Sequence, residues 1–115
     1  MRFGIMYKQG EIVIVPFPFS DLSSVKQRPV LILSKNTDNE TAEDVITCGV
    51  TSNIKDSKYS VLFENKNLIE GEIPKPSRVK VDKLFTISQN IIKKKVGRIN
   101  KETFEKVKSE FIRLI

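Results

Sequence analysis

Pro29-Val30-Leu31-Ile32-Leu33-Ser34 is the stretch of sequence that decides the fold. Its aliphatic run has no alternating polar position, so both faces of the strand that it predicts must be buried. A strand of this kind lies in the middle of a sheet. A second clear strand precedes it at residues 11–15, Glu-Ile-Val-Ile-Val, which starts after Gly10 and ends at Pro16.

Shorter strands are predicted around this pair, and the chain between them is irregular. Residues 16–28 contain two prolines and three serines and are expected to form a long exposed loop, a place where proteins often carry function. Residues 78–84 alternate aliphatic Val79 and Val81 with polar side chains, which predicts a half-exposed strand. The remaining predicted elements are strands at 44–50, 58–64, 86–88 and 95–99, a polar turn at 36–43 and one helical turn at 65–71.

Only the C-terminal end has a helical pattern. Asn100 is a good N-cap, and apolar residues then recur at helical spacing as Phe104, Val107, Phe111 and Leu114. This apolar stripe is expected to pack against the strands or against a partner. Several short strands with frequent turns and one terminal helix predict a mainly β domain, a small barrel with an appended helix.

Length and composition are those of one domain. The 115 residues fit a single unit, with residues 1–7 as a candidate N-terminal tail. No signal peptide is recognisable, and no apolar run approaches the roughly 18–20 residues of a membrane span. The single cysteine, Cys48, lies in a predicted strand and is expected to be a small buried residue. The expected location is therefore the cytoplasm, without membrane association.

The net charge of +6 is unevenly distributed along the chain. Residues 1–57 carry 6 basic and 7 acidic side chains, whereas residues 58–115 carry 14 basic and 7 acidic ones. A basic half indicates an anionic partner such as nucleic acid. A solvated lysine-rich surface explains the charge alone equally well.

The absence of histidine restricts the possible chemistry. Ser-His-Asp and Cys-His arrangements and imidazole general-base catalysis are excluded, and no phosphate-binding glycine loop is present. We expect no cofactor and no metal. RNA cleavage suits the residues that remain, because RNA supplies its own nucleophile, the 2′-hydroxyl. The protein needs only to align this group and to stabilise charge on the phosphoryl oxygens, for which an arginine fork is well shaped.

Four motifs in order resemble the MazF/PemK toxins over residues 8–115. The first is an opening made of Gly-Glu-Ile-Val at 10–13, a loop, and Gln-Arg-Pro-Val-Leu-Ile at 27–32. The others are Gly-Val-Thr-Ser-Asn at 49–53, Pro-Ser-Arg-Val-Lys-Val-Asp-Lys-Leu at 76–84, and Lys-Lys-Val-Gly-Arg-Ile at 94–99 with the helix that follows. The resemblance implies an SH3-like barrel, a homodimer and a cognate antitoxin protein as partner. It also implies metal-independent cleavage of single-stranded RNA, leaving a 2′,3′-cyclic phosphate and a 5′-hydroxyl.

The resemblance places the catalytic arginine at Arg28 and the catalytic threonine at Thr51, with Ser52 able to share the second role. Each residue also has a non-catalytic interpretation: Arg28 could cover a strand end, and Thr51 could cap a turn. Some members of the family use an arginine–aspartate pair, of which this chain has Asp82 but holds Lys80 at the arginine position. Asp82 is thus either catalytic or structural. The candidate RNA-binding residues are Lys26, Gln27, Asn53, Arg78 and Lys80.

Two other functions remain open for a chain of this kind. Gyrase-poisoning toxins resemble this fold and bind their protein target through the C-terminal helix without cleaving RNA. Retention of Arg28 together with Thr51 argues against that function, because a gyrase binder does not need the pair. The second alternative is an inactive binding module.

Overall fold

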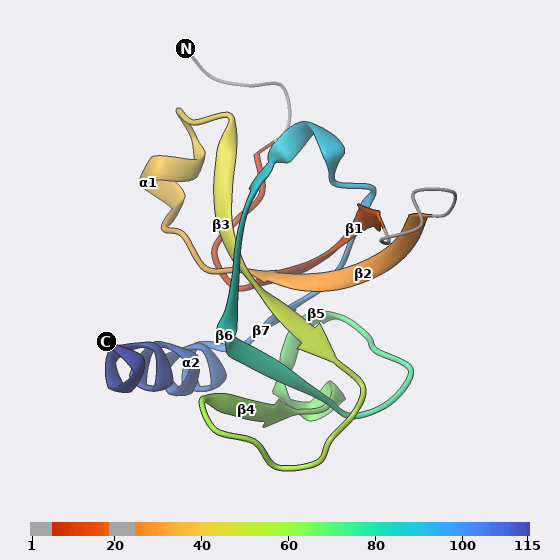
Figure 1. Cartoon of the computed structure of the whole chain (residues 1–115), viewed down its shortest axis with the longest axis vertical. Helices are drawn as coiled ribbons and strands as arrows, with labels where there is room; N and C mark the ends of the chain where they lie inside the picture. Colours follow the sequence, from red (N-terminus) through yellow and green to blue (C-terminus); the bar gives the residue numbers. More distant parts are fainter. Residues whose placement is uncertain (1–5, 19–24) are drawn as a thin grey trace.

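The computed structural model describes residues 6–18 and 25–115. Within these residues, seven antiparallel strands form one curled sheet in the order β4-β6-β3-β2-β1-β7-β5, followed by a C-terminal helix (Figure 1). The expected small barrel with an appended helix is confirmed, as a half-barrel. The elements are β1 (Glu11–Pro18), β2 (Val25–Ile32), α1 (Asn36–Asn39), β3 (Asp44–Thr51), β4 (Ser60–Phe63), η1 (Asn65–Asn67), β5 (Leu68–Gly71), β6 (Ser77–Ser88), η2 (Gln89–Ile91), β7 (Lys94–Ile99) and α2 (Lys101–Leu114).

Strand β2 is central, as its two apolar faces predict, because each face contributes to a different core. Leu31 belongs to a cluster that we call the helix core, which includes Phe63, Val79, Val81 and Val107. Val30 and Ile32 point to the other side. They belong to the hairpin core, whose further members include Val13, Val15, Val45 and Ile87.

The prediction of a loop at 16–28 is wrong for residues 16–18 and 25–28, which are paired strand. Strand β1 continues to Pro18 and β2 begins at Val25, with Pro16 opposite Gln27 in the hairpin. Strand β7 pairs with β1 only as far as Ile14. Beyond Ile14 the described part of β1 is therefore an edge, where a proline is tolerated because no ladder bond needs its missing N–H. Residues 19–24 lie outside the described part of the chain.

Strand β6 replaces the two separate strands predicted at 78–84 and 86–88, and it bends in the middle (Figure 1). Leu84 lies opposite Cys48 of β3, whereas Lys80 lies opposite the next residue, Gly49, so residues 81–83 have no partner on β3. Such a bulge changes which side chains face which side of the sheet. The expected alternation is confirmed from Arg78 through Asp82, with Val79 and Val81 buried and Asp82 exposed, and it ends there because residues 82–86 are all exposed.

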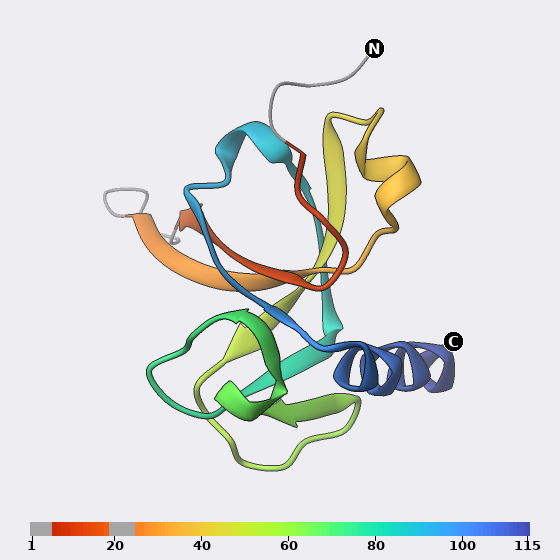
Figure 2. The ribbon, with the colours of Figure 1, turned by 180° about the vertical axis from the view of Figure 1, so that it is seen from behind.

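Helix α2 confirms the predicted N-cap and apolar stripe. The Asn100 side chain accepts a hydrogen bond from the Thr103 N–H at 2.8 Å. Val107 is fully buried in the helix core, against which Phe104 and Phe111 pack. The end of the helix extends beyond the strands (Figure 2), which leaves Ile112 and Ile115 exposed. Among the described residues, no helix is long and apolar enough to cross a membrane.

Two smaller expectations concern Cys48 and the N-terminus. Cys48 is buried as predicted, and burial raises the pKa of its thiol to about 12, so the thiol is protonated at neutral pH. The Tyr7 N–H donates to the Gln89 side chain at 2.9 Å, and its carbonyl accepts from Asn39, so Tyr7 belongs to the folded body. Residues 1–5 of the expected tail lie outside the described residues.

Candidate nucleic-acid groove

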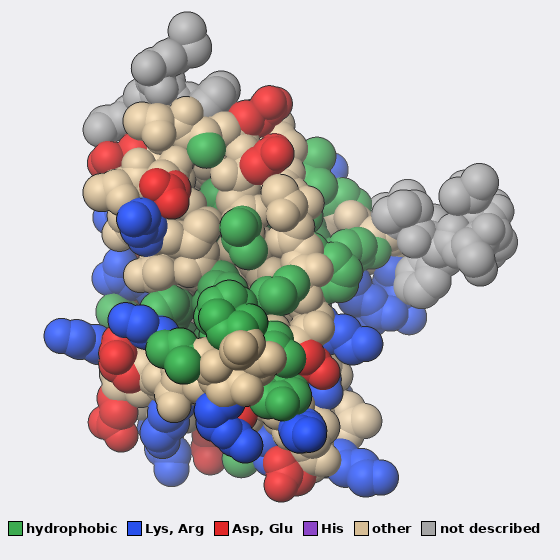
Figure 3. Space-filling view, turned by 60° about the vertical axis from the view of Figure 1, so that its left-hand side comes forward, with side chains coloured by type: hydrophobic (Ala, Val, Ile, Leu, Met, Phe, Trp, Pro, Cys, Tyr) green, Lys and Arg blue, Asp and Glu red, His purple; other side chains and the backbone are tan. Residues whose placement is uncertain are grey.

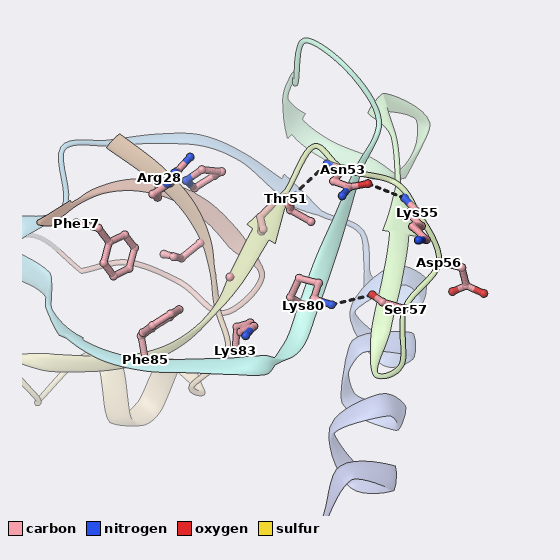
Figure 4. Close-up of a pocket in the computed structure, with 14 residues that line it drawn as sticks. Phe17, Arg28, Thr51, Asn53, Lys55, Asp56, Ser57, Lys80, Lys83 and Phe85 are labelled. Carbon is pink, nitrogen blue, oxygen red and sulfur yellow. Dashed lines mark hydrogen bonds between the residues drawn. The ribbon is translucent and has the colours of Figure 1, made fainter. Parts of the chain in front are cut away.

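A groove of about 620 Å³ opens where the hairpin core meets solvent. It lies at the open side of the half-barrel, and its lining comes from β1, β2, β3, β6 and the residues after β3 (Figure 4). Side chains two residues apart on a strand share a face. Three lining residues therefore each continue the row of a buried core residue on the same strand, namely Phe17 after Val15, Arg28 before Val30 and Phe85 before Ile87.

Thr51 ends β3 at the middle of the groove and organises the turn that follows. Its Oγ1 accepts a hydrogen bond from the Asn53 N–H at 3.1 Å, and the Asn53 Oδ1 accepts from the Lys55 N–H at 3.1 Å. Thr51 is thus a turn cap. A hydroxyl that accepts one bond still has its own hydrogen to donate. The geometry therefore leaves Thr51 able to donate to a phosphoryl oxygen as well.

The groove is lined by four cationic side chains and, among its described lining residues, one carboxylate. Arg28 stands at the exposed end of β2, opposite Val15 of β1. The Lys80 Nζ donates to the Ser57 Oγ at 2.8 Å, which joins β6 to the loop after β3. Lys55 and Lys83 are exposed lining residues, and Asp56 is the carboxylate. A concave surface with this excess of positive charge attracts anions.

Arg78 fixes the loop of residues 52–57 from behind. Its side chain is only 13% exposed, although the sequence predicts a solvated or RNA-facing position. The Nε donates to the Ile54 carbonyl at 2.9 Å, and the Nη1 donates to the Ser60 Oγ at 3.1 Å. The same Nη1 lies 3.5 Å from an Asp56 carboxylate oxygen. Arg78 therefore positions the loop that forms one wall of the groove.

The structure brings together four of the nine candidate residues named from the sequence, because Arg28, Thr51, Asn53 and Lys80 line the groove. The other five are not among its described lining residues. Arg78 lies behind the loop, and the exposed positions are Lys26, Gln27, Ser52 and Asp82.

Sequence reasoning missed Phe17, Gly49, Lys55, Ser57, Lys83 and Phe85 as lining residues. Phe17 was hidden in a segment predicted to be loop, and Phe85 falls between two predicted strands that are in fact one. Two phenylalanines beside a basic strand are a signal for nucleic-acid binding, but only the register of β6 shows that they face one groove.

Comparisons with known proteins agree with this fold. The family described as PemK-like, MazF-like toxin of type II toxin–antitoxin system matches residues 8–115. No curated protein sequence matches the chain.

Solved structures share the fold at low sequence identity. An endoribonuclease from a Mycobacterial species superposes with a TM-score of 0.76 at 19% identity, covering 96% of this chain and 92% of that one. An endoribonuclease in complex with its cognate antitoxin, also Mycobacterial, has a TM-score of 0.71 at 19% identity, over 93% and 92% of the two chains. A chain in a crystal structure of MazE–MazF (form III) from Deinococcus radiodurans has a TM-score of 0.75 at 18% identity, over 96% of each chain.

The fold and the groove define a small half-barrel protein with a cationic groove on one side of its sheet. The chain belongs to the PemK-like, MazF-like toxins of type II toxin–antitoxin systems.

The Arg78 contacts predict a specific loss of stability. Arg78→Ala removes the charged donors that hold the Ile54 carbonyl and Ser60, so we expect the free energy of unfolding to fall by about 1–3 kcal/mol. Amide exchange should accelerate within residues 52–57. The matched control is Lys66→Ala, which removes a cation that is 76% exposed and 4.0 Å from Glu64 and should cost about 0.5 kcal/mol or less. Equal urea midpoints for the two variants would show that Arg78 does not hold the loop.

Proposed function

We propose that this toxin is a metal-independent endoribonuclease that cleaves single-stranded RNA. The observation that carries the proposal is that Arg28 and Thr51, chosen from the sequence alone, line the same groove. They come from different strands, β2 and β3, whose pairing brings residues far apart in the sequence to one surface. When the RNA supplies its own nucleophile, the protein must bind the phosphate and stabilise its charge, which an arginine and a hydroxyl group can do.

In this reaction the 2′-oxygen forms a new bond to phosphorus while the bond from phosphorus to the 5′-oxygen breaks. The 2′-hydroxyl loses a proton and the 5′-oxygen gains one, so the products are a 2′,3′-cyclic phosphate and a 5′-hydroxyl. Arg28 is always protonated and presents a planar fork that matches two phosphoryl oxygens. Thr51 donates its hydroxyl hydrogen to the same group. Both stabilise the charge that grows on the phosphoryl oxygens in the transition state.

Lys80 and Lys83 extend the positive surface along the groove and are suited to neighbouring phosphates of the strand. Asp82, between them in the sequence, is exposed and lies outside the groove lining. This position supports the version of the mechanism that rests on Arg28 and Thr51. We therefore assign Asp82 no part in the reaction.

We further propose that the toxin is a homodimer. Hydrophobic side chains gather across the middle of the face that carries β3, β6 and the end of α2 (Figure 3). The exposed large hydrophobic residues here include Ile46 of β3, Leu84 of β6, Ile112 of α2 (59% exposed) and Ile115 directly after α2 (85% exposed). A clustered apolar surface of this kind is typical of an interface, and an isologous two-fold contact is the usual arrangement for identical chains.

The cognate antitoxin is the third element of the proposal. A largely disordered acidic segment that folds on the toxin would complement the cationic groove and can cover a large surface despite its ordering cost. Its occupation of the groove would exclude RNA sterically.

The reaction predicts cleavage of a long single-stranded RNA in the presence of EDTA. Replacing the 2′-hydroxyl at the cleavage site with hydrogen should abolish cutting, because the nucleophile is lost. Product ends can be identified by mass spectrometry, and persistent cleavage of the deoxy-substituted RNA would disprove this mechanism.

Under single-turnover conditions Arg28→Ala should lower the rate by about 10²–10³-fold, the cost of a lost transition-state donor. Arg28→Lys should recover only part of the lost rate, since the point charge of a lysine does not replace the planar fork of the guanidinium group.

Asp82→Asn is the control for Arg28→Ala and should keep most of the activity. A loss as large as that of Arg28→Ala would instead make Asp82 the general base. Circular dichroism should establish that both variants are folded. An Arg28→Ala protein with the wild-type rate would remove the basis of the proposed active site.

The dimer predicts that a charge on the apolar face dissociates the protein. Light scattering at micromolar concentration should give twice the 13.2 kDa chain mass for the wild type and the chain mass for Leu84→Glu and Ile112→Glu. Ile91→Glu is the matched control, because Ile91 is an exposed isoleucine on η2, outside the elements of this face, and should leave the dimer intact. A fully active wild-type monomer would contradict the proposal.

Steric inhibition predicts competition between antitoxin and RNA. Adding the protein encoded by the neighbouring reading frame, or its acidic segment as a peptide, should weaken binding of a fluorescein-labelled RNA in proportion to its occupancy. Unchanged RNA affinity at saturating antitoxin would mean that the inhibitor acts elsewhere on the toxin.

A further inference from the structure

Phe17 and Phe85 stand together at one end of the groove (Figure 4). Their ring centroids are 5.0 Å apart and their planes are inclined by 54°. Phe85 is 38% exposed although it is a large apolar residue, and Phe17 is partly exposed. Both rings therefore present apolar surface to the groove, where a ligand rather than the core can cover it.

Gly49 keeps the Phe85 ring accessible from the side of β3. A Cβ atom at this position would lie 3.8 Å from the Phe85 Cε2 and 3.4 Å from the Lys83 Cβ. A longer side chain growing from that point would meet the ring and fill the groove beside it. The glycine thus leaves space next to an exposed aromatic surface.

The charges around the two rings favour a nucleotide rather than a neutral ligand. Arg28 and Lys83 line the groove on this side, whereas Asp56 comes from the loop at the opposite end (Figure 4). An aromatic surface flanked by cations has the composition of a site for single-stranded nucleic acid, in which a base stacks and the adjoining phosphates meet the positive charges.

We infer that Phe17 and Phe85 form a binding site for one nucleobase, next to the phosphate that Arg28 and Thr51 engage. This inference rests on the proposed function, because it names a subsite of the same RNA groove. The base is held by its face and by contact with two inclined rings. Such contacts require a base but tolerate any of the four, because every base has a π-face. The subsite therefore supplies affinity and alignment, while base identity is read elsewhere.

The test combines a protein variant with a missing base. A short RNA containing a mapped cleavage site is prepared in versions that each lack one base, at successive positions around the scissile bond. With the wild-type protein, one abasic position should raise KM by about 5- to 150-fold, the range for a lost stacked base. Phe85→Leu should show a similar rise with the complete RNA, and Phe85→Tyr should restore wild-type binding.

The decisive result is that the effects of the Phe85→Leu substitution and of the missing base do not add. In Phe85→Leu the penalty at that one abasic position should vanish, while penalties at other positions stay unchanged. Phe104→Leu is the matched control, since it makes the same substitution in α2 against the helix core and should leave the abasic profile intact. Urea unfolding of each variant separates loss of binding from loss of folding. Equal abasic penalties in wild type and Phe85→Leu would overturn the subsite.

A binding assay separates this inference from the proposed reaction. Anisotropy of a fluorescein-labelled RNA with a 2′-deoxy nucleotide at the cleavage site, or of an unselected single strand if none is cut, reports affinity without cleavage. Base-dependent binding that needs Phe85, in a protein that cleaves no RNA, would overturn the reaction and support the subsite. Cleavage that is indifferent to Phe85 would overturn the subsite alone, and absence of both binding and cleavage would overturn both.

Discussion

Strand β6 contains three residues that have no partner on β3, at the point where it passes the junction of Cys48 and Gly49. A hydrogen bond from outside β3 stabilises this bulge, because the Val81 N–H donates to the Tyr59 carbonyl at 2.9 Å. Tyr59 adopts a left-handed backbone conformation with φ of 56°, which is uncommon for an aromatic residue. The bulge shifts the alternation of β6, so Lys80 before it and Lys83 and Phe85 after it all line one groove. With regular alternation, Lys80 and Phe85 would lie on opposite faces.

The balance of charge differs between the β7–β5 edge of the sheet and the groove. Along β7 and β5, Lys95 forms ion pairs with Glu11 and Glu70, and Arg98 pairs with Glu70. The hydrogen bond from Lys95 lowers the pKa of Glu70, and the two carboxylates raise the pKa of Lys95. The groove has only Asp56 as a carboxylate among its described lining residues, and Arg78 is bonded to it. Positive charge is thus concentrated where a polyanion can neutralise it.

Much of the fold follows from local sequence patterns, because local patterns report local structure. The double-sided apolar run around Leu31 predicts a central strand, and Asn100 with the stripe through Val107 predicts the cap and the buried face of α2. The sequence predicts too short a β1–β2 hairpin, because Pro16 and Pro18 indicate a loop unless the strand is known to lie at a sheet edge. This part of β1 is an edge because β7 stops pairing with it at Ile14, and strand pairing of this kind is decided by the tertiary structure.

The site was predicted less completely than the fold, for the same reason. Arg28 and Thr51 could be chosen from motifs, but Arg78 looked like a surface cation until its bond to Ile54 placed it behind a loop. Phe17 and Phe85 are separated by most of the chain, and nothing in either neighbourhood indicates the other. Their contact requires β1, β2, β3 and β6 to curl around one core. Residues that meet only through sheet curvature cannot be paired from one sequence.

The same strand connects the groove to the proposed dimer surface. Leu84 and Phe85 are neighbours on β6, and successive strand residues point to opposite faces. Leu84 is exposed on the outer face of the sheet and Phe85 lines the groove. The Phe85 carbonyl accepts a hydrogen bond from the Thr47 hydroxyl at 3.0 Å, which holds this part of β6 against β3. A partner that packs on Leu84 would therefore restrain the backbone that carries Lys83 and Phe85. Dimer formation and alignment of the RNA strand would then depend on the same few residues of β6.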